Sequence, residues 1–338
     1  MLATKQNVLR RFWYATVRLD DLAAGPRPFT LLGERIVLFL GADGQPAALE
    51  DRCPHRTARL SLGWCDKGRV ICGYHGWEFD SEGHLARIPQ FTEGQALPNA
   101  QIRKFHAQAR YGYVWVALEQ PLADIPAVPE DEDPAFRRIY QHYGRWECSA
   151  LRLMENSFDQ AHIAFVHKGT FGEIDRPRPT RYAIEETDEG FWAETEVRVA
   201  NPPRAHRVTG DTGEWTVRTM RNAWYMPFCR RLDITYPSGR RHIIFNCATP
   251  IDDGAIQVTQ LLFRNDTEAD CPEQELIDWD AEVLLEDRTM LESTDPDAVL
   301  DLARKAEMHM PSDHPGLIMR KRLLALLAAH GEEEVAAA

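Results

Sequence analysis

Short hydrophobic runs separated by turn residues make up the first third of the chain. The runs cover residues 11–17, 29–32, 35–40, 47–50 and 113–118. Gly33-Glu34 separates the second run from the third, which predicts a β-hairpin, and Gly41-Ala42-Asp43-Gly44 predicts the next turn. Strands this short and this closely spaced are typical of a small β-sandwich or barrel.

The pattern changes in the second half of the chain. We expect helices over residues 151–167, 278–292 and 316–330, the first of them ended by Gly169. Between the first and second helices, residues 181–264 return to strands, with alternating apolar and polar positions at 193–199. Helices on both sides of a run of antiparallel strands predict an α+β domain.

A proline-rich, acidic stretch separates these two patterns. Residues 121–134 contain four prolines and the run Glu130-Asp131-Glu132-Asp133, which is typical of a linker. We therefore predict an all-β domain at residues 1–120, a linker at 121–134 and a larger α+β domain at 135–338.

The composition excludes several classes of protein. With 44% hydrophobic and 27% charged residues, it is typical of a soluble globular protein, and apolar stretches such as residues 36–40 have strand length rather than membrane length. A net charge of −13 argues against a nucleic-acid partner. Seven cysteines, an odd number, favour free thiols and a cytoplasmic location over a disulfide scaffold.

One window departs from the acidic average. Residues 51–76 carry five basic side chains and two acidic ones, a local charge of +3. This window is either an ordinary solvated loop surface or a docking surface for an acidic electron donor, since complementary charge accelerates encounter.

Two cysteines and two histidines in that window form the first candidate site. Cys53-Pro54-His55 and Cys72-Gly73-Tyr74-His75 supply two thiolates and two imidazoles. A [2Fe–2S] cluster can hold one iron by cysteines and the other by histidines. Tetrahedral zinc is the alternative, although zinc ligands more often come as paired cysteines and paired histidines, whereas each half here mixes the two.

The second candidate site is Asn156-x-x-Asp159-x-x-His162-x4-His167. Two imidazoles with carboxylates nearby predict a 2-His-1-carboxylate iron(II) site with open positions for oxygen. The histidines are five apart, about 140° around a regular helix, so we expect a loosened turn at residues 163–166. Asp159 precedes His162 by three residues, and we expect its carboxylate to accept a hydrogen bond from that imidazole.

The third metal ligand and the substrate pocket are less well defined. The residue pattern leaves five acidic candidates for the ligand, which are Glu282, Glu286, Asp287, Glu292 and Asp295. Candidates for the pocket lining are Phe158 and Phe165, with Trp224, Tyr225 and Phe228 as weaker ones.

Taken together, the two donor sets resemble those of the α-subunit of Rieske non-heme iron ring-hydroxylating oxygenases, in the layout of the α-only monooxygenases and demethylases. The resemblance runs from Phe12-Trp13-Tyr14-Ala15 to Asp313-His314-Pro315-Gly316. It implies an all-β Rieske domain followed by a helix-grip catalytic domain. The implied ligands are Cys53, His55, Cys72 and His75 for the [2Fe–2S] cluster, and His162, His167 and Asp287 for mononuclear Fe(II).

The resemblance also implies a mechanism, an oligomeric state and an electron donor. Asn156 would lie close to the iron, and in a homotrimer Asp159 would join His162 to His75 of the next subunit. The protein would be a terminal oxygenase that uses O2 to hydroxylate or oxidatively demethylate a small aromatic or cyclic substrate. No G-x-G-x-x-G segment follows a strand, so electrons must come from a separate NAD(P)H-dependent reductase or ferredoxin.

Two other functions stay open. The first is cis-dihydroxylation by a dioxygenase of the same family. The second is a Rieske electron-transfer protein without oxygenase activity, which is disfavoured because a complete second metal motif follows the linker.

Overall fold

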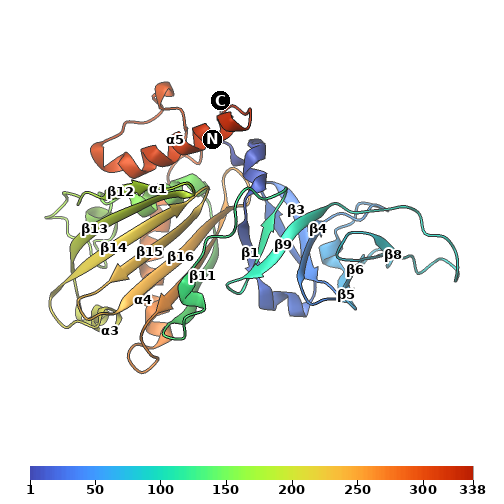
Figure 1. The fold of residues 1–338 in the computed structure, drawn as a ribbon, viewed down its shortest axis with the longest axis horizontal. Helices are drawn as coiled ribbons and strands as arrows, with labels where there is room; N and C mark the ends of the chain where they lie inside the picture. Colours follow the sequence, from blue (N-terminus) through green and yellow to red (C-terminus); the bar gives the residue numbers. More distant parts are fainter. Residues whose placement is uncertain (338) are drawn as a thin grey trace. The chain divides into compact units, whose positions relative to one another are not determined.

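The computed structural model describes residues 1–337, which form two compact units. One is Asn7–Ile125, and the other joins Met1–Gln6 to the chain from Pro126 onward. The first unit is all-β, and the second combines an antiparallel sheet with helices (Figure 1), which confirms the predicted fold class. Of the helices in the described chain, none has the length and apolarity to cross a membrane.

Two antiparallel sheets build the first unit, in the orders β1-β10-β9-β4-β3-β2 and β5-β6-β7-β8. Their strands are β1 Tyr14–Arg18, β2 Arg27–Leu31, β3 Glu34–Leu40, β4 Pro46–Glu50, β5 Trp64–Asp66, β6 Arg69–Ile71, β7 Glu78–Phe79, β8 Leu85–Arg87, β9 Lys104–Arg110 and β10 Tyr113–Ala117. The predicted hairpin is β2–β3. Its loop is Leu32-Gly33 rather than Gly33-Glu34, because Leu31 pairs with Glu34, and both loop residues have positive φ, as a type I′ turn requires.

A seven-stranded antiparallel sheet builds the second unit, in the order β11-β17-β16-β15-β14-β13-β12. The strands are β11 Arg137–Trp146, β12 Ala183–Glu186, β13 Gly190–Ala200, β14 Trp215–Tyr225, β15 Cys229–Thr235, β16 Arg241–Pro250 and β17 Ile256–Arg264. Side chains alternate between the two faces of a strand, and residues 218 and 220 of β14 and 230, 232 and 234 of β15 line an internal cavity.

The helices of this unit are α1 Ala150–Phe158, α2 Ile163–Val166, α3 His206–Thr209, α4 Glu273–Leu291 and α5 His314–Ala329. Of these, α1, α2 and α4 contribute residues to the cavity wall. Helix α4 runs along the sheet (Figure 1) and contacts β11, α1 and α2. The two later predicted helices are confirmed, although α4 begins earlier than expected, directly after Pro272. Short 3-10 helices are Ala3–Lys5, Asn7–Arg11, Leu19–Ala24, Leu60–Leu62, Pro129–Asp131, Pro203–Ala205, Leu302–Arg304 and Pro311–Asp313.

The first predicted helix is interrupted, and not at the place we expected. Residues 163–166 form a regular helical turn, and the break lies between Phe158 and His162. Asp159 leaves the helical region at φ −81°, ψ 123°, and its Oδ1 accepts a 2.7 Å hydrogen bond from the Ala161 N–H. An aspartate that bonds the backbone two residues on offers the chain a turn in place of the next helical bond.

Candidate metal centres

The first donor set lies on two loops with the same backbone shape. The Cys53 N–H donates to the Ala58 carbonyl and the Cys72 N–H to the Trp77 carbonyl, at 2.8 and 2.9 Å. The N–H four residues after each cysteine donates back to the cysteine carbonyl at 2.9 Å. Those residues, Thr57 and Gly76, both have positive φ, of 58° and 72°. The two turns therefore have the same backbone hydrogen bonds around the cysteine. They differ in the position of the histidine, which follows Cys53 by two residues and Cys72 by three.

The two thiols are buried, whereas the His55 imidazole is exposed and the His75 imidazole is half-buried. Cys53 and Cys72 belong to one core cluster. Burial, with a smaller contribution from Cys72, raises the pKa of the Cys53 thiol to about 11. Such a thiol is not a free reactive thiolate, and a bound metal would deprotonate it. The His55 and His75 ring centroids are 4.5 Å apart, and His55 stacks on Trp77 at 4.7 Å.

This arrangement fits two irons better than one zinc ion. Zinc requires all four donors around a single ion. Within residues 1–337, the only group of three or more His, Cys, Asp or Glu atoms close enough to share one ion lies in the other unit. A buried thiol pair and a more accessible imidazole pair match a cluster with one iron of each kind.

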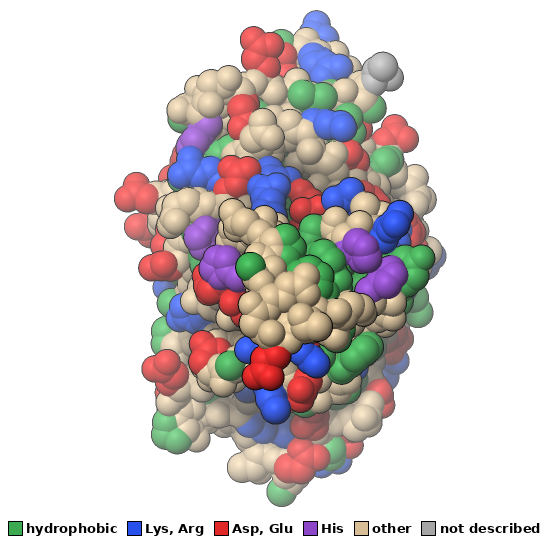
Figure 2. Space-filling view, turned by 90° about the vertical axis from the view of Figure 1, so that its right-hand side faces the viewer, with side chains coloured by type: hydrophobic (Ala, Val, Ile, Leu, Met, Phe, Trp, Pro, Cys, Tyr) green, Lys and Arg blue, Asp and Glu red, His purple; other side chains and the backbone are tan. Residues whose placement is uncertain are grey.

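Apolar side chains are exposed on the second of these loops and on the segment that joins the two loops. Leu62 is 78% exposed and Tyr74 64%, and Trp64 is exposed as well. Figure 2 shows histidine side chains beside hydrophobic ones on this face. The five basic side chains of residues 51–76 are all exposed. We call Leu62, Trp64 and Tyr74 the cluster rim.

The second donor set forms a compact triangle in the other unit. His162 and His167 flank α2, and Asp287 lies on α4. The Nε2 atoms of the two histidines are 3.1 Å apart and lie 3.5 and 3.4 Å from Asp287 Oδ1. Ligands about 2.1 Å from one metal and at right angles to each other lie about 3 Å apart, so the triangle fits one face of an octahedral iron site.

Each corner of the triangle has a polar partner behind it. Glu286 Oε2 lies 2.9 Å from His167 Nδ1 and accepts a 2.9 Å hydrogen bond from Thr170. Asn156 Nδ2 donates to Asp287 Oδ1 at 3.0 Å. The third contact is longer, since His162 Nδ1 lies 3.6 Å from Asp159 Oδ2 and is buried without a hydrogen bond. Carboxylates behind metal-bound imidazoles orient the rings.

The other acidic candidates for the third ligand point elsewhere. Glu282 pairs with Arg204, and Glu292 pairs with Arg288. Asp295 lies beyond the end of α4. Glu286, considered as a rival ligand from sequence, contacts the far side of the His167 ring instead.

The protonation states suit metal binding. Burial lowers the pKa of His167 to about 4, although the Asp287 charge opposes this, so the imidazole is neutral. Desolvation raises the pKa of Asp159, but the nearby His162 imidazole and the hydrogen bond from the Ala161 N–H outweigh it and lower the pKa overall. Asp159 is therefore a carboxylate at neutral pH.

The triangle opens into the internal cavity. Its apolar lining includes Met220, Leu232, Ile234, Ile244 and Leu284. Its polar lining includes Arg218, Arg230, Asn246, His242 and Asp280. The predicted aromatic lining is wrong: Phe165 is 54% exposed, and Phe158, Trp224, Tyr225 and Phe228 do not line this cavity. The aromatic residues that do are Phe171, Tyr182, Tyr236 and Trp279.

Asp159 also faces outward. Its side chain is 29% exposed and lines a second, open hollow together with Glu155, Pro315 and Gly316. Phe165 on α2 and Leu285 and Met290 on α4 are exposed apolar side chains of these two contacting helices.

The chain matches two family models and several known proteins. Residues 12–106 match the Rieske [2Fe-2S] domain, and residues 146–329 match the vanillate O-demethylase oxygenase C-terminal domain. Methylxanthine N1-demethylase NdmA of Pseudomonas putida is 28% identical over 97% of this chain and 92% of its own length. A vanillate O-demethylase oxygenase subunit of Pseudomonas sp. (strain HR199 / DSM 7063) is 32% identical over 64% of this chain and 55% of its own length.

Solved structures extend this similarity to three dimensions. The structure of a Pseudomonas putida NdmA mutant with theobromine superposes with a TM-score of 0.82 at 27% identity, over 97% of this chain and 94% of that one.

Proposed function

The chain belongs to the Rieske oxygenases that share the vanillate O-demethylase catalytic domain, and from this membership we propose the reaction it carries out. It is an oxidoreductase that uses O2, and its cofactors are a Rieske [2Fe–2S] cluster and a mononuclear non-heme iron. We propose that it inserts one oxygen atom into a small aromatic or cyclic substrate, by demethylation or hydroxylation.

The observation that carries this proposal is the triangle of His162, His167 and Asp287. Two imidazoles and one carboxylate on a single face leave the other coordination positions free for oxygen, next to a largely apolar cavity. We propose these three residues as the iron ligands and Cys53, Cys72, His55 and His75 as the cluster ligands. When bound, the iron supplies oxygen activation: one oxygen atom enters the substrate and the other leaves as water, with two electrons and two protons supplied.

Other side chains of the protein orient the proposed iron ligands. Glu286 orients the His167 ring, and Asn156 donates to the Asp287 oxygen that faces both histidines. The apolar side chains of the sheet exclude water from the cavity and hold the substrate against the open side of the triangle.

We further propose that the protein works as a homotrimer in which Asp159 contacts His75 of the next subunit. A carboxylate that lies near His162 and is also exposed in an open hollow supports this contact. The cluster rim and the exposed side chains Phe165, Leu285 and Met290 offer two apolar surfaces of the kind that subunit interfaces bury.

Electrons would come from a separate reductase or ferredoxin, and the exposed basic side chains of residues 51–76 suit an acidic donor. We place the protein in the cytoplasm, since its seven cysteines are free thiols.

Purified protein, a surrogate reductase and NADH test the proposal. We expect iron and acid-labile sulfide, a reddish-brown absorption spectrum, and oxygen uptake that depends on a methoxylated or N-methylated aromatic substrate and releases formaldehyde, or gives a hydroxylated product. A colourless protein, or oxygen uptake that no such substrate changes, would overturn it.

A further inference from the structure

One charged side chain in the cavity wall lacks a partner. Arg218 lies in β14, is only 7% exposed, and lines the cavity together with His162, His167 and Asp287. Its Nε is buried without a hydrogen bond, and no described residue forms an ion pair or a hydrogen bond with its guanidinium group.

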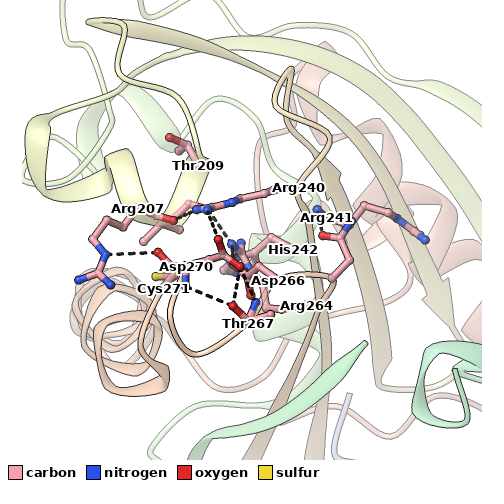
Figure 3. Close-up of polar contacts among 12 residues, drawn as sticks. Arg207, Thr209, Arg240, Arg241, His242, Arg264, Asp266, Thr267, Asp270 and Cys271 are labelled. Carbon is pink, nitrogen blue, oxygen red and sulfur yellow. Dashed lines mark hydrogen bonds and ion pairs between the residues drawn. The ribbon is translucent and has the colours of Figure 1, made fainter. Parts of the chain in front are cut away.

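Among the described residues, the other three buried arginines each form an ion pair with a carboxylate. Arg231 forms two 2.8 Å hydrogen bonds with Glu130. Arg264 pairs with Asp266 (Figure 3), and Arg320 pairs with Glu155. Arginine cannot relieve burial by losing its proton, so a buried guanidinium group requires an anion. For Arg218 the described chain provides none.

Aromatic rings hold the cation in place. The guanidinium carbon lies 4.3 Å from the Phe171 ring centroid and 6.0 Å from that of Tyr236. The Phe171 ring in turn stacks on His167 at 4.9 Å. Rings that contact the flat face of a guanidinium group leave the N–H donors at its edge free for a planar anion. One aromatic ring therefore connects this anion site to a corner of the metal triangle.

From this geometry we infer that Arg218 binds a carboxylate group of the substrate, and that the substrates of this protein are small aromatic or cyclic carboxylates. The inference rests on the proposed function, because it takes this cavity as the substrate site. The carboxylate pairs with the N–H donors of Arg218 as a two-bond fork. The apolar body of the substrate then lies along Met220, Leu232 and Leu284, and its reacting carbon faces the triangle.

Equilibrium binding without turnover tests this inference. The probes are benzoate and benzamide, which share a shape and differ in charge, titrated anaerobically by calorimetry into protein that contains cluster and iron. We expect benzoate to bind at least about 30-fold more tightly than benzamide, as for a buried charge pair whose one partner is removed. Equal affinity for the two probes, or no binding of benzoate, would overturn the inference.

Two substitutions on the same strand assign the preference to one residue. Arg218→Gln should abolish it. Arg221→Gln should preserve it, because Arg221 is exposed on the opposite face and pairs with Glu194. A benzoate preference that survives Arg218→Gln would contradict the inference. If that variant does not fold, Arg218→Lys keeps the charge and should keep part of the preference, and the comparison of the two probes on the unchanged protein remains decisive.

The inference and the proposed function can fail separately. Substrate-dependent oxygen uptake with neutral compounds only, and no preference for benzoate, would contradict the inference alone. A preference for benzoate in protein that binds no mononuclear iron would contradict the proposed function alone.

Discussion

Replacing Glu286 by glutamine tests whether the carboxylate behind His167 supports iron binding. One Glu286 oxygen serves two partners, since it lies 2.9 Å from His167 Nδ1 and accepts a 2.9 Å hydrogen bond from Thr170. Glutamine keeps the length and one acceptor oxygen but removes the charge. A charge-assisted hydrogen bond contributes about 1 to 1.5 kcal/mol more than a neutral one, which corresponds to about 10-fold in affinity. This lies at the lower end of the range for changes behind a metal ligand, about 10- to 100-fold.

The assay is anaerobic titration of Fe(II) into protein that contains the cluster but has been stripped of mononuclear iron, in competition with a chelator. Visible absorption follows the cluster independently. Glu282→Gln is the matched control, because Glu282 lies on the same helix, one turn earlier, and pairs with exposed Arg204. We expect about 10-fold weaker iron binding in Glu286→Gln and no change in the control. Unchanged iron affinity in Glu286→Gln, or equal losses in both variants, would refute the reasoning.

Four further outcomes are expected. Asp287→Ala should lose mononuclear iron and keep the cluster, as metal analysis and absorption would show; iron retained in this variant would exclude Asp287 as a ligand. Asp159→Asn should keep both centres but slow turnover about 10- to 100-fold, and rapid mixing with substrate and oxygen should show a reduced cluster that fails to reoxidise. Cys72→Ser should abolish the Rieske electron paramagnetic resonance signal, and a retained signal would rule out this ligand. Glu130→Gln should lower the free energy of unfolding by about 3–5 kcal/mol in denaturant titrations, because Arg231 loses its buried partner.

The last of these predictions also has a pH dependence. Burial raises the pKa of Glu130, but the hydrogen bonds and charge of Arg231 outweigh it and lower the pKa below the usual glutamate value. The stabilisation is therefore present above the usual pKa and is lost as the pH falls through the lowered one. The stability gap between wild type and Glu130→Gln should close in acid, and a gap that stays constant to low pH would contradict this.

The candidate ligands that the structure brings together were easier to predict from the sequence than the groups around them. The spacing of His162 and His167 predicted a break at residues 163–166, but these residues are helical and the chain breaks before His162 instead. That break depends on the Asp159 side chain, which accepts a hydrogen bond from the Ala161 N–H, a local competition that helical periodicity does not report. The candidates for the third ligand stayed open because neighbours on a helix point in different directions, and α4 could be oriented only by its packing against α1, α2 and β11.

The substrate side of the site was not predictable in the same way. Whether Arg218 faces the cavity depends on which face of β14 is covered, and this follows from strand pairing and from helices far away in the sequence. Phe165 was misplaced for the same reason, because helical spacing alone does not say which side of α2 meets the rest of the protein. A lone arginine in an alternating strand gives no signal until its neighbours are known.

The residues that line the cavity come from two sets of secondary-structure elements. The metal triangle comes from α1–α2 and α4, whereas much of the opposite wall comes from alternate residues of β14, β15 and β16. Changes in that wall leave the metal triangle and its hydrogen-bonded partners untouched. Proteins of this architecture can therefore diverge in the compounds they accept while their chemistry stays constant. A laboratory selection for new substrates should enrich mutations at the cavity-lining positions of these three strands.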